Sequence, residues 1–284
     1  MSHLNDTHLS SKSLFLQSDD CAISISDTHK SFYLNEGLNP PADTTMMIAL
    51  TSFEMPYSYY NVVSERNDEL QILVGREEVT INVGSRNFDG SQLGDKLTSL
   101  LAMYSSQLDT TIQVIFNQST HKFTFLSDLL PFTIVSTTLW KELGFKKDVE
   151  NYTSSGLILN APNMGNLSGT SSIFVRILNL GINNYDSRGK KIGVIGKINV
   201  NCNAGHFIFY ENKESIYYKI QERSLNFLEV QLTDDEGRDL NLNGGEWSMV
   251  LTIHYEKTKI GYLDENYLLT TRTTRVEKPN MEKS

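Results

Sequence analysis

Large apolar residues alternate with small or polar residues along most of this chain. The clearest alternation lies at residues 247–255, where every second side chain is large and apolar. A period of two is typical of a β-strand with one buried face. Segments of the same kind predict strands at residues 22–26, 31–34, 45–53, 173–177, 192–200, 206–210, 216–220 and 228–232. Gly, Asn and Asp clusters separate many of these segments, so we expect an antiparallel all-β fold, either a sandwich or a barrel.

One segment, residues 65–150, breaks this alternation. Within it, residues 91–107 carry leucines at intervals of three and four, the period of a helix with one buried face, and Ser91 stands where an N-cap is expected. The rest of the segment predicts an extended stretch at 71–83 bent at Gly75, a hairpin of 111–116 and 122–125, and a short helix at 136–143 ended by Gly144. We therefore expect an inserted α+β subdomain.

Composition places the chain among globular proteins and away from disorder. Of its 284 residues, 39% are hydrophobic and 21% are charged, and the net charge is −9. Proteins that bind duplex nucleic acid normally offer clustered Lys and Arg side chains. Here Lys146–Lys147 and Lys190–Lys191 are isolated pairs. We therefore expect no direct binding of nucleic acid.

Neither the N-terminus nor the cysteine content indicates a secreted or membrane protein. The first residues lack a basic start followed by an apolar core, and the apolar stretch at 46–50 is far too short to cross a bilayer. Cys21 and Cys202 stand alone in the sequence, whereas small secreted domains usually carry a disulfide framework. We expect no transmembrane segment and favour two reduced thiols, with a single bridge as the alternative.

Candidate chemical sites are few. Residues 239–244 match the opening of a calcium-binding loop, but Val250 stands where that loop needs a bidentate Glu. Cys202 and His206 are close enough in sequence to form a thiol–imidazole pair, yet no group nearby marks an orienting partner. The histidines lack metal-ligand spacing, and adjacent acidic residues in a strand point to opposite faces. We expect no catalytic residue, no metal and no cofactor.

Three tyrosines, Tyr57, Tyr59 and Tyr60, follow Pro56 closely. Such a cluster can stack on sugars or fill a protein interface. It is also typical of the half-buried surface of a sandwich, which is the interpretation that we prefer.

Several longer segments, taken in order, resemble a known family. They are SFEMPYSYYNVVSERND at 52–68, VIFNQSTHKFTF at 114–125, WKELGF at 140–145, IFVRILNLGINNYD at 173–186, KIGVIGKINVNCNAGHFIFYEN at 191–212 and LEVQLTDDEGRDLNLNGGEWSMVLTIHY at 228–255. In this order they resemble the penton, or minor capsid, proteins of virophages and polinton-like viruses. The resemblance implies a single jelly-roll β-sandwich, often with an inserted domain.

Pattern and resemblance together divide the chain into four parts. We expect an N-terminal arm at residues 1–12, a jelly-roll domain of 13–64 plus 151–257, an inserted α+β domain at 65–150 and a C-terminal tail at 258–284. The two ends are assigned as arm and tail because their polar sequences have little to bury.

The resemblance implies a structural function and not an enzymatic one. The protein would form the homopentameric fivefold vertex of an icosahedral virion. Its partners would be a double-jelly-roll major capsid protein and other minor capsid proteins of the same virus. It would be located in the virion and made in the host cytoplasm.

A second hypothesis comes from a different class of function. A jelly roll also suits a carbohydrate-binding or receptor-binding attachment protein, since a fold does not decide function. A hydrolase ranks third, because no acid, base and nucleophile converge in the sequence.

Overall fold

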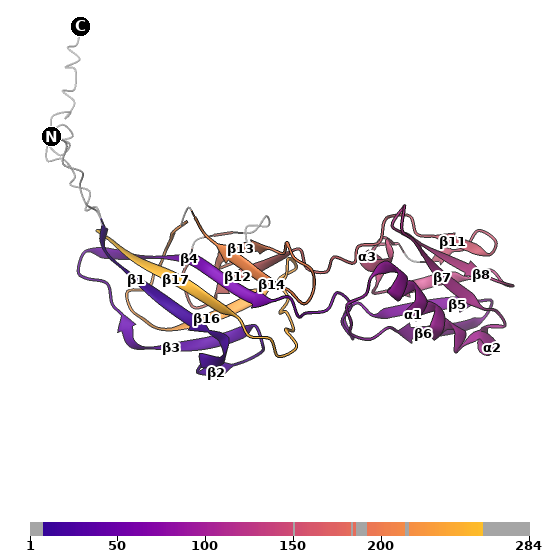
Figure 1. Cartoon of the computed structure of the whole chain (residues 1–284), viewed down its shortest axis with the longest axis horizontal. Helices are drawn as coiled ribbons and strands as arrows, with labels where there is room; N and C mark the ends of the chain where they lie inside the picture. Colours follow the sequence, from indigo (N-terminus) through magenta and orange to yellow (C-terminus); the bar gives the residue numbers. More distant parts are fainter. Residues whose placement is uncertain (1–7, 150, 183, 186–191, 214–215, 258–284) are drawn as a thin grey trace, which may run out of the picture.

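The computed structural model of this chain describes residues 8–149, 151–182, 184–185, 192–213 and 216–257. These residues form two lobes that lie end to end and are joined by two crossings of the chain (Figure 1). Each lobe has its own apolar core, one built from residues 16–59 and 173–255 and the other from residues 62–161.

The first lobe is a sandwich of two antiparallel sheets. One sheet has the order β1 (His8–Gln17), β17 (Ser248–Lys257), β4 (Thr44–Pro56) and β14 (Phe207–Glu211), with β15 (Tyr218–Lys219) also on β4. The other has the order β13 (Val194–Asn199), β12 (Ser172–Ile177), β16 (Leu225–Thr233), β3 (His29–Leu38) and β2 (Ile23–Ser24). Apart from the two-residue strands, the chain order across the sheets is first, eighth, third, sixth and fifth, fourth, seventh, second. This is the order of a jelly roll, as expected.

The last strand shows how the alternation in the sequence builds the sandwich core. Met249, Leu251, Ile253 and Tyr255 on β17 all point inward and are buried, as the sequence predicts. Trp247 lies just before this strand and is also buried. Its indole N–H donates to the carbonyl oxygen of Asp27 at 3.0 Å, and its ring meets the ring of Phe32 edge-on.

The second lobe is the inserted α+β segment, placed between β4 and β12. One sheet has the order β10 (Tyr152–Thr153), β9 (Thr133–Thr137), β5 (Glu69–Val74) and β6 (Glu77–Asn82), and the other has β11 (Ile158–Asn160), β8 (Lys122–Ser127) and β7 (Ile112–Asn117). The helices are α1 (Gly90–Ala102), α2 (Ser105–Leu108) and α3 (Trp140–Leu143), while the first lobe has a short 3-10 turn, η1 (Ser18–Asp20). None of the described helices is long and apolar enough to cross a membrane.

The N-cap of helix α1 lies two residues earlier than the sequence predicts. Its N-cap is Asp89, whose carboxylate accepts the backbone N–H of Gln92 while the Gln92 side chain accepts the N–H of Asp89. This reciprocal capping box satisfies two backbone donors that the helix leaves free, so Asp89 and not Ser91 is the N-cap. The helix ends at Ala102 and not at residue 107, and α2 follows separately. The apolar face of α1 covers β7, where Gly94 allows the close approach, since a Cβ there would lie 2.9 Å from the carbonyl oxygen of Val114.

Three expected boundaries are wrong. Residues 8–12, assigned to an arm, belong to β1, because their backbone pairs with β17 whatever their side chains are. The short helix expected at 136–143 covers only 140–143, because residues 136–137 pair with β5. The insertion does not end at 150, because β10 and β11 pair with β9 and β8 of the second lobe. Residues 1–7 and the tail at 258–284 lie outside the described residues.

Candidate functional site

The two chain crossings between the lobes are tied together by one buried amide. Asn61, on the first crossing, donates through Nδ2 to the carbonyl oxygens of Phe88 and Leu167, both at 2.8 Å. Its Oδ1 accepts the backbone N–H of Phe88 at 3.0 Å. Leu167 lies on the second crossing, so a single side chain holds both crossings against the inserted lobe.

Asn67 extends this network to helix α3. Its Nδ2 donates to the carbonyl oxygen of Asn61 at 2.8 Å and to Oε1 of Glu142 at 2.7 Å. Glu142 is buried, with 7% of its surface exposed. Burial raises the pKa of Glu142, and the hydrogen bond from Asn67 opposes that rise only in part. Asn67 therefore holds one oxygen of this carboxyl group, while the other, Oε2, is buried and has no hydrogen-bond partner among the described residues.

Arg66 and Asp234 make an ion pair across the junction. Nη2 of Arg66 lies 2.5 Å from Oδ2 of Asp234, which sits in the turn after β16 and is fully buried. Oδ2 of Asp234 also contacts Nε of Arg238 at 2.9 Å, and Oδ1 accepts the backbone N–H groups of Glu236 and Arg238. Burial raises the pKa of Asp234, but the hydrogen bonds from Arg238 and the charges of Arg238 and Arg66 outweigh it and keep the pKa below its usual value.

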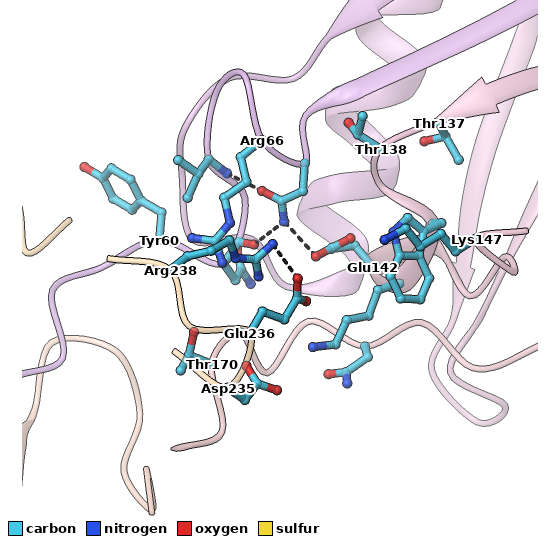
Figure 2. A pocket seen from close by; sticks show the side chains of 17 residues that line it. Tyr60, Arg66, Thr137, Thr138, Glu142, Lys147, Thr170, Asp235, Glu236 and Arg238 are labelled. Atoms are coloured by element: carbon cyan, nitrogen blue, oxygen red, sulfur yellow. Dashed lines mark hydrogen bonds and ion pairs between the residues drawn. The ribbon is translucent and has the colours of Figure 1, made fainter. Parts of the chain in front are cut away.

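A pocket of about 390 Å³ opens beside this ion pair, lined by both lobes (Figure 2). The inserted lobe contributes Trp140 and Glu142, the connecting segment contributes Tyr60 and Arg66, and the sandwich contributes Glu236 and Arg238 among others. Some of its charged groups pair with one another, as the Arg238–Glu236 contact at 2.7 Å illustrates. No three His, Cys, Asp or Glu side chains among the described residues are grouped to hold a metal. The arrangement is suited to holding the two lobes in a set orientation.

Two members of the tyrosine cluster lie in the sandwich core and not on its surface. Tyr57 and Tyr59 are both buried and stack with ring centroids 4.4 Å apart. The hydroxyl of Tyr57 donates to the carbonyl oxygen of Ser168 on the second crossing at 3.1 Å. Burial raises the pKa of Tyr59 far above its usual value. The half-buried surface that we expected is therefore wrong for these two, and of the three only Tyr60 is exposed, at the pocket.

The residues that resemble a calcium loop lie in the connection between β16 and β17, with an isolated bridge at Asp239 and a turn at Asn243 and Gly244. Leu240 and Leu242 are buried in the sandwich core. The Asp239 carboxylate accepts hydrogen bonds from Ser26 and Gln231. These positions agree with the structural interpretation of the segment, in which alternate residues enter the core.

Cys202 and His206 flank a tight turn. The backbone N–H of His206 donates to the carbonyl oxygen of Asn203, which closes the turn, and Cys202 packs against the sandwich core. Cys202 and Cys21 are both free thiols, which agrees with the favoured interpretation.

Two outward-facing aromatic sites were not singled out from the sequence. On β14, Phe207 and Phe209 are 56% and 67% exposed and stack with centroids 6.0 Å apart. On the other sheet, the half-buried Phe174 has the charged ends of Lys197 and Arg176 at 5.8 and 6.0 Å from its ring centroid. Alternation in the segment 206–210 predicts two faces but does not tell which one enters the core, because both carry large apolar side chains.

Comparisons with known proteins give a likeness of fold. No family model matches the chain, and no curated protein matches it in sequence. Among solved structures, the crystal structure of selenomethionine-labelled mavirus penton protein has a TM-score of 0.50 at 11% identity, and the match covers 87% of this chain and 99% of that one. A cryo-EM structure of the Sputnik virophage covers 87% and 98%, with 10% identity and a TM-score of 0.40. The expected resemblance to virophage penton proteins is confirmed at the level of the fold by the mavirus match.

Proposed function

We propose that this chain is a structural protein of an icosahedral virus capsid and that five copies form its fivefold vertex. The observation that carries the proposal is the mavirus penton match, which extends over 99% of that protein and 87% of this chain. Since the match covers so much of the chain, it takes in residues of both lobes. The vertex position and the number of copies are our inference from this likeness.

The arrangement of the lobes supports a role in a shell. The inserted lobe leaves and re-enters the sandwich at one end, between β4 and β12, and projects along its long axis (Figure 1). A sandwich placed in the shell would therefore hold this lobe away from its neighbours at the vertex. Its partners would be a double-jelly-roll major capsid protein and other minor capsid proteins, in a virion assembled from proteins made in the host cytoplasm.

In this proposal no residue carries out catalysis, and no cofactor takes part. The ion pairs of Asp234 support this view, because two arginines engage its carboxylate.

The pocket at the junction favours one second candidate, attachment to a carbohydrate or receptor. Tyr60 and Trp140 offer aromatic rings there, and Glu142 lines the same pocket with an oxygen, Oε2, that has no hydrogen-bond partner among the described residues. Aromatic rings with nearby polar groups are suited to binding sugars. Titration with a glycan array would detect saturable binding, and Trp140→Ala should abolish it. If binding persists in this variant, the carbohydrate site is not the junction pocket.

The vertex proposal is tested by imaging and by mass. Purified protein is examined by negative-stain electron microscopy and by light scattering over a range of protein concentrations and ionic strengths. Fivefold rings, or density for this chain at the vertices of particles assembled with the capsid protein, are expected. A dimer or trimer under every condition, with no fivefold species and no density at the vertices, contradicts the proposal.

A further inference from the structure

Strand β14 presents two stacked phenylalanines at the edge of its sheet. Among the described residues it pairs with β4 alone, so its other side is an open edge. Ile208 is fully buried while Phe207 and Phe209 on either side of it are exposed, so both rings lie on the outer face. An exposed apolar edge strand is an aggregation risk that proteins normally cover. We therefore expect the outer face of β14 to be covered by a binding partner.

Acidic side chains surround these two rings. Glu54 on β4 is opposite Phe209 in the register, and Glu211 is two residues further along β14 on the same face. Both carboxylates are exposed. Phe207, Phe209, Glu54 and Glu211 together form what we call the β14 surface, which is aromatic and negatively charged.

The outer face of the other sheet carries an exposed lysine beside an aromatic ring. Phe174 alternates with the fully buried Ile173 and Val175, so its ring faces outward. Lys197 is opposite Phe174 in the register, and its Nζ lies 5.8 Å from the ring centroid. Arg176 lies on the same face two residues along β12, but it is half-buried and its guanidinium donates to Oγ1 of Thr233 at 3.0 Å and to the carbonyl oxygen of Ile192 at 2.9 Å, so its charge is engaged within the subunit. We call Phe174 and Lys197 the β12 surface.

The two surfaces lie on opposite sides of the sandwich, since each is on the outer face of a different sheet. Two β14 surfaces would repel each other, because each carries two carboxylates, so a twofold contact between identical surfaces is disfavoured. A β14 surface meeting a β12 surface instead pairs the carboxylates with the exposed cation of Lys197 and covers the aromatic rings. A contact between two different surfaces generates a ring when its rotation closes.

We propose that the β14 surface of one copy packs on the β12 surface of the next and that this contact builds the ring. The inference rests on the proposed vertex function and names the interface that the function requires. The two stacked phenylalanines supply the apolar centre of the contact, and the charges at their margin select the heterologous partner.

A charge-exchange experiment tests the pairing. Glu54→Lys with Glu211→Lys, and separately Lys197→Glu, should each raise the concentration for half-assembly by roughly tenfold or more, because like charges then face each other. Combining the three substitutions should restore assembly toward the wild-type level. Phe207→Ser with Phe209→Ser should weaken assembly without repair by any charge change. Half-assembly is read from light scattering, or from occupancy of the vertices where free rings do not form.

Controls lie on the inserted lobe. Glu77→Lys reverses an exposed charge and Leu129→Ser removes an exposed apolar side chain there, and both should assemble as wild type does. Circular dichroism checks that each variant is folded. Should the strand variants unfold, Lys197→Glu decides the question, since Lys197 is exposed and its replacement disturbs no core.

The outcomes separate the two ideas. Wild type that reaches fivefold assembly while the charge variants match it, or while the triple variant shows no rescue, overturns the interface and leaves the vertex function standing. Wild type that forms no fivefold assembly, free or at vertices, overturns the vertex function and this interface with it.

Discussion

At the scale of single residues, a few buried polar side chains hold the junction and one large aromatic holds the sandwich. Asn61 and Asn67 close the two chain crossings, and Asp234 receives Arg66 from across the junction. A buried polar group contributes when its hydrogen-bonding capacity is filled and costs free energy when a partner is removed. Residues of this kind are therefore sensitive points for substitution.

Trp247→Ala should lower the free energy of unfolding by about 3–5 kcal/mol, because it removes a fully buried ring from the sandwich core. Trp247 is 2% exposed and contacts Phe32. Urea denaturation measures the change. Phe15→Ala is the matched control, since Phe15 is 77% exposed and should change stability little. A loss below about 1 kcal/mol for Trp247→Ala would mean that the ring is not part of the core.

Asp234→Asn should destabilise the protein by about 2–3 kcal/mol at neutral pH, because it removes the charge that Arg66 and Arg238 engage. The pKa of Asp234 is lowered in the folded state, so its ionised form adds stability above the unfolded pKa, and that stability is lost as the pH falls through the folded pKa. The difference between the variant and wild type should therefore shrink below about pH 4.

Denaturation at neutral and acidic pH checks this prediction. Asp235→Asn is the control, because the same substitution at the exposed neighbour should change little at either pH. A difference for Asp234→Asn that stays constant or grows on acidification contradicts the assignment of the ion pair.

At the scale of elements, local hydrogen bonds decide where a segment begins more than hydrophobic pattern does. The leucines of α1 predict a helix, and Leu93, Leu97 and Leu101 are indeed buried on one face. The start, however, is set by the pair of bonds between Asp89 and Gln92. Apolar spacing has no influence on a cap, which satisfies backbone groups outside the periodic face.

Asp89→Ala should cost about 1 kcal/mol, whereas Ser91→Ala should cost only a few tenths. The reason is that the Asp89 carboxylate accepts the backbone N–H of Gln92 at 2.8 Å, while Ser91 lies inside the helix and is exposed. Chemical denaturation of the two variants, which introduce the same residue two positions apart, measures the difference. Equal losses of stability in the two variants would contradict the assignment of Asp89 as the N-cap.

At the scale of the whole molecule, two lobes with separate cores are joined end to end by a hydrogen-bonded junction. Two crossings connect the lobes, and the Asn61 side chain bridges them at 2.8 Å from Leu167. The ends of the insertion are therefore close together, which is the condition for removing an inserted unit without breaking its host. The separability of the inserted lobe stays a prediction.

Replacing residues 62–167 by a short Gly/Ser linker should leave a sandwich that unfolds cooperatively. The matched comparison replaces only 65–150, the bounds expected from the sequence. That variant should aggregate or lose cooperativity, because β10 and β11 would lose β9 and β8 and the buried Leu159 and Ala161 would lose their core. Thermal unfolding followed by circular dichroism distinguishes the two. If only the variant that replaces residues 65–150 unfolds cooperatively, the domain bounds expected from the sequence are correct and those taken from the structure are wrong.

The sequence by itself determined the all-β class, the inward faces of strands such as β17 and the presence of a mixed insertion. Alternation is a local property, so residues such as Leu251 and Val175 could be assigned to the core without knowing their partners. The resemblance to penton proteins likewise came from the order of strand and turn segments, and the likeness of fold agrees with it.

Only the tertiary structure decided what depends on contacts between distant segments. The two-residue and three-residue strands β10 and β11 are too short to show a period, and β1 is held by backbone pairing that its side chains do not reveal. The Arg66–Asp234 pair joins residues that are 168 positions apart. The placement of Phe209 beside Glu54 likewise depends on register between two strands. Long-range pairing of this kind is set by how the sheets come together, which no local pattern of residues encodes.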